Sequence, residues 1–213
     1  MRRLSPSEEI ERTHKLYEQQ CLAGAAACVI GVDEVGRGAV AGPLTVAAVV
    51  LPLEPHILGL DDSKKLTAAK REELAAEIRR VARFIGIAHI QPQVIDSIGI
   101  VASLRDAMVQ AVKACNIKAS QILIDGNPLH LFEQERCIVK GDSTVACIAA
   151  ASIIAKVARD AIMVAADEEY PGYELASNKG YASSQHICAI REKGLSSFHR
   201  HSFCQGFLQQ QLF

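Results

Sequence analysis

The chain has 213 residues, of which 49% are hydrophobic and 22% charged, and its formal net charge is −1. This material suffices for one substantial core with at most a small appended part, so we expect a globular protein. The near-neutral charge excludes a general basic field, so a polyanionic partner must be held by a local patch or by metal ions.

The cysteines and the apolar runs indicate a cytoplasmic protein. Seven cysteines form no C-x-x-C pair and lie mostly inside apolar runs, as small buried side chains of a reducing compartment do. The basic start, Met1 to Arg3, continues into a polar segment and not into the apolar core of a secretory signal. Gly, Pro or polar residues interrupt each apolar run before the roughly 18 residues that a membrane span requires. We therefore expect no membrane association.

The first ninety residues are expected to form two helices and three strands. A capping box with proline at the first helical position begins a helix over 5–22. Valine-rich runs at 26–35 and 44–51 flank a connection that contains Gly and Pro, which predicts two neighbouring antiparallel strands. Thr67 caps an amphipathic helix that ends before a third strand at 83–90.

The remainder alternates short strands with longer helices. Residues 92–115 are expected to be helical, with a break near Gly99. The patterns after them predict two strands and then two helices, at 121–126, 136–142, 143–169 and 182–193. Strands in the first half and helices in the second indicate an α/β core with a C-terminal helical part, and we place the boundary near Tyr170.

Four carboxylates stand at the ends of predicted strands. Asp33 and Glu34 end the first strand, Asp125 ends the fourth and Asp142 ends the fifth. An acid there is costly to bury unless it is paired, hydrogen-bonded or bound to a metal ion. Each acid alone is better explained as a cap or turn residue, as Asp142 is for a helix beginning at Ser143, but four together favour one site.

The adjacency of Asp33 and Glu34 raises a geometric problem, because neighbouring side chains of an ideal strand point to opposite faces. The two acids share one site only where the strand departs from ideal pleating or where they bind different sides of a cluster.

Four oxygen ligands favour Mg²⁺ or Mn²⁺ over zinc. Two such ions about 3.5–4 Å apart can clamp a phosphodiester during in-line displacement. The H-x-H pair of His199 and His201 is a weaker metal signal, and a structural or phosphate-binding role is favoured for it. The glycines of GRGAVAG lack the spacing of a nucleotide-binding loop and precede a strand-like run, which disfavours nucleotide binding.

The order of several longer motifs resembles one known family. The motifs extend over residues 29–203 and are GVDEVGRGAVAGPLTVAAVV, DDSKKLT, LIDG, KGDS followed by IAAASIIAKVARD, NKGY and FHRHSF. They resemble those of bacterial ribonuclease HII, the type 2 ribonuclease H. The resemblance implies an α/β, RNase H-like fold, with a five-stranded mixed sheet flanked by helices and a C-terminal helical extension. Residues 1–170 would form the catalytic domain, and residues 171–213 the substrate-binding extension and tail.

For the activity, the resemblance implies metal-dependent cleavage of the RNA strand of RNA/DNA hybrids and incision 5′ of single ribonucleotides in duplex DNA. The residues that it assigns to metal binding and catalysis are Asp33, Glu34, Asp125 and Asp142. One Mn²⁺ or Mg²⁺ ion would activate the attacking water and a second would stabilise the leaving oxygen, giving 5′-phosphate and 3′-hydroxyl ends.

The resemblance also assigns substrate contacts. Gly36, Arg37 and Gly38 would contact the 2′-hydroxyl, because glycine lets backbone groups approach the sugar closely. Tyr181 of NKGY would stack on the sugar of the next deoxyribonucleotide; without the resemblance, a half-buried amphipathic ring is the better explanation. Phosphate contacts are predicted for Ser63, Lys64, Lys156, Arg159 and Arg200.

The last five residues, QQQLF, resemble the short peptides by which bacterial replication and repair proteins dock on the DNA sliding clamp. Leu212 and Phe213 would enter an apolar pocket, and Gln209 would be held by hydrogen bonds. We otherwise expect a monomer.

Other functions stay open at this point. A resolvase-like or exonucleolytic member of the RNase H fold would keep the acids but not the Gly-Arg-Gly loop. Type 3 ribonuclease H carries an extra N-terminal domain, for which this N-terminus is too short, and usually Glu in place of Asp125. A non-catalytic nucleic-acid- or nucleotide-binding module is disfavoured because all four acids are present.

Overall fold

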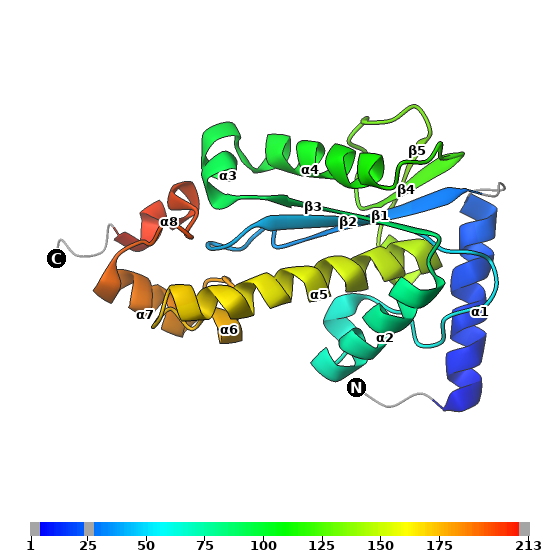
Figure 1. Ribbon diagram of the computed structural model, residues 1–213, viewed down its shortest axis with the longest axis horizontal. Coiled ribbons are helices and arrows are strands. Elements are labelled where there is room, and N and C mark those ends of the chain that lie inside the picture. Colours follow the sequence, from blue (N-terminus) through cyan, green and yellow to red (C-terminus); the bar gives the residue numbers. More distant parts are fainter. Residues whose placement is uncertain (1–4, 24–27, 209–213) are drawn as a thin grey trace.

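One mixed sheet forms the centre of the molecule, which was analysed as a computed structural model that describes residues 5–23 and 28–208 (Figure 1). Its five strands lie in the order β3-β2-β1-β4-β5. β1 is antiparallel to β2 and parallel to β4, while β2–β3 is antiparallel and β4–β5 is parallel. The strands are β1 (Val29–Val35), β2 (Leu44–Val50), β3 (Phe84–Ile90), β4 (Gln121–Asp125) and β5 (Glu135–Ile138). The predicted five-stranded mixed sheet is confirmed.

Helices cover both faces of this sheet (Figure 1). On one face lie α3 (Pro92–Ile98) and α4 (Ile100–Ala114), which pack on a cluster that includes residues of β1 and β2. On the other face lie α1 (Pro6–Ala23), α2 (Ala68–Val81) and α5 (Ala146–Glu169). Because both faces are covered, all seven residues of the apolar strand β2 are buried.

The long helix α5 passes very close to β1. A Cβ added at Gly31 would lie 2.3 Å from the carbonyl carbon of Cys147, so only glycine permits this approach. The N-cap residue of α5, Val145, has no capping side chain, and the buried Gln20 of α1 instead accepts the N–H of Cys147 at 2.9 Å. Helix α1 therefore completes the start of the helix that borders the sheet.

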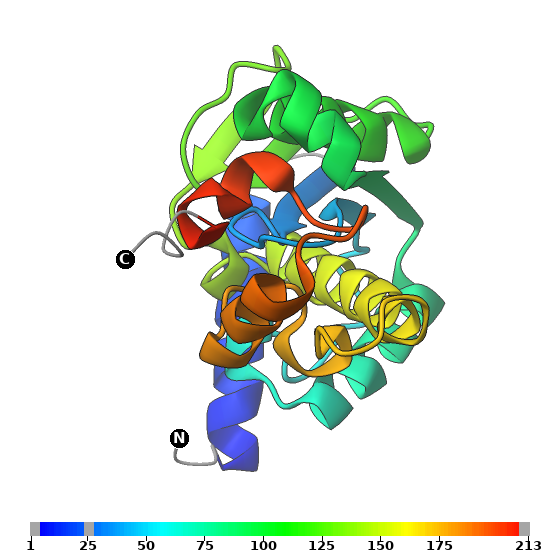
Figure 2. The same cartoon turned by 90° about the vertical axis from the view of Figure 1, so that its left-hand side faces the viewer.

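The C-terminal helices lie at the far end of α5, and Figure 2 views the molecule from that end. They are α6 (Leu175–Asn178), α7 (Ser184–Lys193) and α8 (His201–Leu208). Their apolar cluster includes Val40 and Ala41 of the β1–β2 connection. Asp96 of α3 accepts the N–H groups of His201 and Ser202 at 2.8 and 3.0 Å, which caps α8. A domain boundary at residue 170 stays a prediction.

Two predicted boundaries are wrong around Asp142. Strand β5 ends at Ile138, and Asp142 lies in a short 3₁₀-helix, η2 (Gly141–Ser143), which follows Lys140 in a left-handed conformation. Helix α5 begins at Ala146 and not at Ser143, so Asp142 neither ends a strand nor caps this helix. Residues 140–144 are all polar or glycine, so the sequence indicates a turn here but does not fix where the strand ends and the helix begins.

No helix within residues 5–23 and 28–208 combines the length and the hydropathy needed to cross a membrane.

Candidate active site

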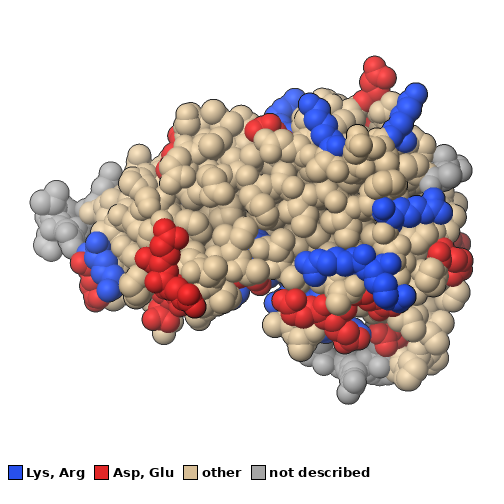
Figure 3. All heavy atoms as spheres, viewed as in Figure 1, with Lys and Arg blue, Asp and Glu red and all other residues tan. Residues whose placement is uncertain are grey.

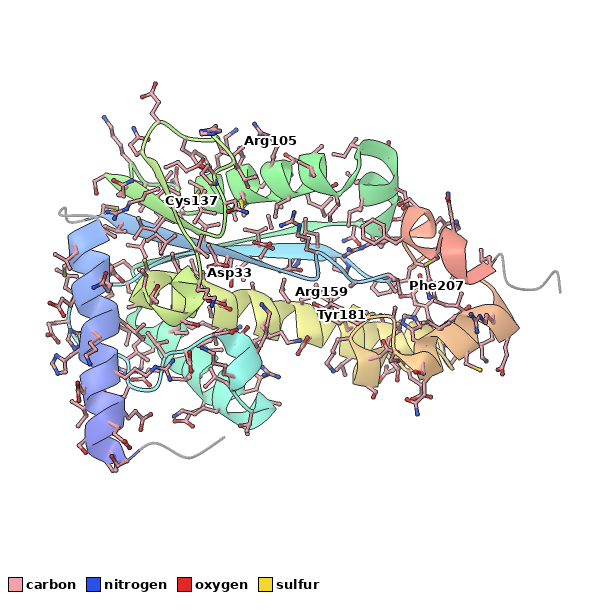
Figure 4. The ribbon with its side chains drawn as sticks, turned by 180° about the vertical axis from the view of Figure 1, so that it is seen from behind. Asp33, Arg105, Cys137, Arg159, Tyr181 and Phe207 are labelled. Carbon is pink, nitrogen blue, oxygen red and sulfur yellow. The ribbon has the colours of Figure 1, made fainter. Side chains whose placement is uncertain are left out.

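Asp33 and Glu34 lie near the end of β1, and Figure 4 shows Asp33 on the side of the sheet that α5 covers. The pairing with β2 is regular through both, because Asp33 lies opposite Ala47 and Glu34 opposite Val46. Asp33 is buried, and its carboxylate accepts the N–H of Glu34 at 2.7 Å. The backbone departs from the strand two residues later, where Gly36 has φ +83°. The departure from strand geometry, one of the two alternatives left open by the sequence, therefore falls after the two acids and not at them.

Asp125 and Asp142 are joined through the backbone of η2. Asp125 is the last residue of β4, the parallel neighbour of β1. Its carboxylate accepts the N–H of Gly141 at 2.7 Å and that of Asp142 at 3.4 Å. Asp142 is buried and accepts the hydroxyl of Ser143 at 3.3 Å. The turn after β5 therefore brings the fourth acid to the end of β4.

The four acids influence one another electrostatically. Burial is the largest cause that raises the pKa of Asp33 well above its usual range, and the charges of Glu34 and Asp125 add to it. The pKa values of Glu34 and Asp142 are also raised, first by burial and then, among the nearby acids, by Asp125. Burial acts to lower the pKa of Lys64, but nearby carboxylates, first Asp62 and then Asp33, Asp142 and Asp125, outweigh it, so that this pKa is raised. The structure thus places all four predicted acids in one electrostatic cluster.

This donor set fits a hard divalent cation in its chemistry. All of the donors are carboxylate oxygens, and a bound cation would compensate the burial and the repulsion that raise the pKa values of Asp33, Glu34 and Asp142. In the part of the chain that the structure describes, no three His, Cys, Asp or Glu side chains converge as a formed ligand group. Two of the carboxylates instead accept backbone N–H groups, Asp33 that of Glu34 and Asp125 that of Gly141.

A cavity of about 450 Å³ adjoins the acids. It is lined by Glu34, Val35, Gly36, Arg37, Gly38, Ser63, Lys64, Ser152, Lys156 and Tyr181. The residues predicted to contact substrate from the Gly-Arg-Gly loop, from 63–64 and from NKGY therefore meet around one space, beside one of the predicted metal ligands. Figure 3 shows the outline of the molecule hollowed between α2 and the C-terminal helices. The cavity is lined by Ser63 and Lys64, which precede α2, and by Tyr181, which lies between α6 and α7.

Some side chains of the cavity wall are exposed, and another is fixed by an ion pair. Arg37 is 57% exposed and lies 3.7 Å from the Glu34 carboxylate, and Tyr181 is 39% exposed. Lys156 pairs with Asp160 at 2.8 Å, and burial is the main cause that lowers its pKa. A Cβ added at Gly38 would meet no atom within 4 Å, so backbone at this position is open to an approaching molecule.

The structure does not support the phosphate contacts predicted for Arg159 and Arg200. Both side chains are fully buried. Arg159 donates to the backbone carbonyls of Ala41, Pro43 and Lys179, and Arg200 donates to those of Gly42 and Arg37. A cation that is enclosed and bonded in this way holds loops together and does not face a duplex.

Two further polar residues at the site were not predicted. Ser152 is buried, its hydroxyl lies at hydrogen-bond distance, 2.9 Å, from that of Ser63, and its hydrogen bond to Asp33 acts to lower the pKa of that acid. Lys65 donates to Ser143 at 2.8 Å and to Asp61 at 3.3 Å. A lone serine within the apolar run AAASIIA of α5 is the signal that could have identified Ser152. The structural role favoured for His199 is confirmed, since this buried ring bonds to Ser196 and His186.

Comparison with known proteins decides the family. The sequence model of the family described as Ribonuclease HII matches residues 30–206. This chain belongs to the ribonuclease HII family. It is 46% identical over 198 residues to the ribonuclease HII of Moorella thermoacetica, across 92% of this chain and 96% of the relative. The chain is therefore a type 2 ribonuclease H, an endonuclease that acts on RNA paired with DNA.

Solved structures share the fold. The ribonuclease H2 of Pyrococcus horikoshii OT3 has a TM-score of 0.71 at 24% identity, over 84% of this chain and 96% of that one. A complex of PCNA with RNase HII from Archaeoglobus fulgidus gives 0.66 at 26% identity, over 82% and 94%. Bst-RNase HIII in complex with Mn²⁺ gives 0.61 at 19% identity, over 93% and 70%. The RNase H-like fold with a helical C-terminal part is thus confirmed.

Proposed function

We propose that this ribonuclease H, besides cleaving the RNA strand of RNA/DNA hybrids, incises duplex DNA on the 5′ side of a single embedded ribonucleotide. The observation that carries the proposal is the single cavity that unites Glu34 of the acid cluster with the Gly36–Gly38 loop and Tyr181. Recognition of one ribonucleotide requires a contact with its 2′-hydroxyl close to the scissile phosphate. In this cavity, backbone that could contact the 2′-hydroxyl lies in the same space as an acid of the proposed metal site, which supports the proposal.

The four acids Asp33, Glu34, Asp125 and Asp142 would hold the divalent ions, Mn²⁺ or Mg²⁺. When bound, such ions lower the pKa of the attacking water and stabilise the charge on the leaving oxygen. The carboxylate chemistry of the cluster and the Mn²⁺ complex of the structural neighbour Bst-RNase HIII support this assignment. The products would carry 5′-phosphate and 3′-hydroxyl ends.

The predicted substrate residues that line the cavity would have tasks that follow from their chemistry. Backbone groups of the Gly36–Gly38 loop would bond to the 2′-hydroxyl, and the exposed Tyr181 ring would stack on the next sugar. Phosphate oxygens would be met by Ser63, Lys64 and Lys156. In this scheme residues 171–213 act as a substrate-binding extension, because Tyr181 belongs to them.

A partner is proposed for the end of the chain. Gln209, Leu212 and Phe213 lie outside the described residues. We propose that they bind the DNA sliding clamp, in line with the complex of PCNA and RNase HII from Archaeoglobus fulgidus. Such docking would place the enzyme at newly replicated or repaired DNA.

The proposal is tested by incubating the protein with a duplex that contains one ribonucleotide, in Mg²⁺, Mn²⁺ or excess chelator. We expect metal-dependent nicking that Asp125→Asn reduces beyond the roughly 10–100-fold loss typical of residues that only orient a metal ligand. Asp106→Asn, which changes an acid on α4 bonded to Gln110, is the matched control and should nick normally. Nicking that survives the chelator, or equal rates for the two variants, would contradict the acid cluster as the metal site.

A further inference from the structure

We propose that Arg159 is a positioning residue that determines specificity, because its buried guanidinium sets the Gly36–Gly38 loop and Tyr181 at a fixed separation. This inference rests on the proposed function, in which those two features read the ribonucleotide and the sugar that follows it. Arg159 itself reaches no substrate, since it is fully buried.

Its hydrogen bonds join two segments that are far apart in the chain. On one side Nε donates to the carbonyl of Pro43 at 2.8 Å and Nη2 to that of Ala41 at 3.1 Å. On the other side Nη1 donates to the carbonyl of Lys179 at 2.8 Å, two residues before Tyr181. One rigid, planar group therefore spans the connection after the Gly-Arg-Gly loop and the turn that carries the tyrosine.

Arg159 also contacts both reading elements directly. Its Cζ lies 5.5 Å from the centre of the Tyr181 ring, in cation–π geometry (Figure 4). At the loop, a Cβ added to Gly36 would lie 2.2 Å from Arg159 Nε, so the side chain fills the space beside this glycine. The tyrosine ring and the start of the loop are thus both packed against the same guanidinium.

The guanidinium shape matters more than the charge at this position. Its donors lie in one plane and meet three carbonyls, whereas an ammonium group is a point charge on a flexible stem. Arg159→Lys would keep the charge but release at least one of the two segments. Arg200 offers a comparison, since it also donates to loop carbonyls, at Arg37 and Gly42, but its cation–π partner is Phe203.

The experiment compares kcat/KM on two substrates, a duplex with one ribonucleotide and a continuous RNA/DNA hybrid, for the wild type and Arg159→Lys. We expect the variant to lose at least tenfold more on the single ribonucleotide than on the hybrid, where many register positions are productive. Combining it with Tyr181→Ala should cause little further selective loss, because the arginine acts through the tyrosine. Arg105→Lys on α4, which removes a comparable bond to the Leu129 carbonyl, is the control for general loosening.

Each outcome separates this inference from the proposed function. A wild type that does not nick the single-ribonucleotide duplex overturns the proposed function. If the wild type nicks but Arg159→Lys loses activity equally on both substrates, the role of Arg159 is overturned. It is also overturned if adding Arg159→Lys to Tyr181→Ala causes a full further loss that is selective for the single ribonucleotide. Where Arg159→Lys does not fold, Arg159→Gln keeps a planar donor group and should show the same selectivity change. Failure of both variants to fold would assign the residue to stability alone and also overturn the proposal.

Discussion

Gly36 and Gly38 flank the same arginine but are constrained in different ways. Gly36 has φ +83°, and a Cβ there would lie 2.2 Å from Arg159 Nε. Gly38 lies outside the left-handed region of backbone space, and a Cβ there would project into open space. The first glycine is therefore required by the fold, and the second is free for contact with a substrate.

Alanine at the two positions should separate these tasks. Gly36→Ala is expected to lower the free energy of unfolding by at least about 1–2 kcal/mol from backbone strain, before the clash is counted. Gly38→Ala should change stability by less than about 0.5 kcal/mol and yet reduce nicking at a single ribonucleotide, because the methyl group blocks close approach. Urea unfolding and the nicking assay measure the two effects, and normal activity of Gly38→Ala would remove this glycine from the reading loop.

The limit of sequence reasoning is clearest at the buried arginines. The sequence predicts Arg159 and Arg200 to be surface cations, because it does not show that four carbonyls of the 37–43 connection accept five hydrogen bonds from them. The grouping of the acids could be expected because all four lie near the ends of predicted strands, whereas the substrate contact of the Gly-Arg-Gly loop follows from the family resemblance and stays a proposal. The role of Gln20 could not be expected, since its bond to Cys147 joins residues 127 positions apart.

At the scale of elements, strong periodicity decides what is predictable. The boundaries of α1, α2 and β3 agree with the sequence to within two residues, because caps and apolar alternation mark them. Helices α6 and α8 were missed, since 4 and 8 residues give too few turns for a periodic pattern. The cap of α8 comes from Asp96 on α3, which no local signal reveals.

A pair of histidines links α7 with the segment before α8. The N–H of Ser196 donates to His199 Nδ1 at 3.1 Å, so the proton of this ring lies on Nε2. That Nε2 then donates to His186 Nε2 at 3.1 Å, and His186 Nδ1 donates to the carbonyl of Tyr181 at 2.9 Å. Both rings are neutral in this chain of bonds, and its last acceptor belongs to the residue proposed to stack on the substrate.

This pair should make stability depend on pH. Burial, and then the neighbouring His186, lower the pKa of His199 from 6.5 to about 4. Between these values the unfolded chain binds more protons than the folded one, so stability falls as the pH is lowered from 6.5 toward 4. We expect a loss of about 1 kcal/mol per pH unit, after allowance for solvent screening, relative to a His199→Gln variant. Urea titrations at several pH values test this, and parallel curves for the two proteins would refute it.

For the whole molecule, the α/β core holds the acids and the C-terminal helices bring Tyr181 to them. Basic and acidic side chains lie next to each other over α2 on the face drawn in Figure 3, in keeping with the net charge of −1. Since the net charge gives no general basic field, the proposed attraction to nucleic acid depends on local cations such as Lys64 and Lys156 of the cavity. A monomeric state stays a prediction.

Removal of residues 209–213 should abolish binding to the bacterial sliding clamp, because the proposed clamp-binding residues Leu212 and Phe213 are lost. Nicking of a free short duplex should continue, because the deletion leaves the cavity intact. A pull-down with purified clamp measures the first effect. A matched control exchanges only Gln210 for Ala. Clamp binding that persists after the deletion would exclude the tail as the docking segment.

The measurement that tests the central claim most directly maps the nick in a DNA duplex with one ribonucleotide at single-nucleotide resolution, in Mn²⁺ or Mg²⁺. The account predicts one nick on the 5′ side of the ribonucleotide, with a 3′-hydroxyl and a 5′-phosphate, and none in the all-DNA duplex. It would be contradicted by an uncut ribonucleotide strand under conditions in which the continuous hybrid is cleaved, or by equal cutting of the all-DNA duplex.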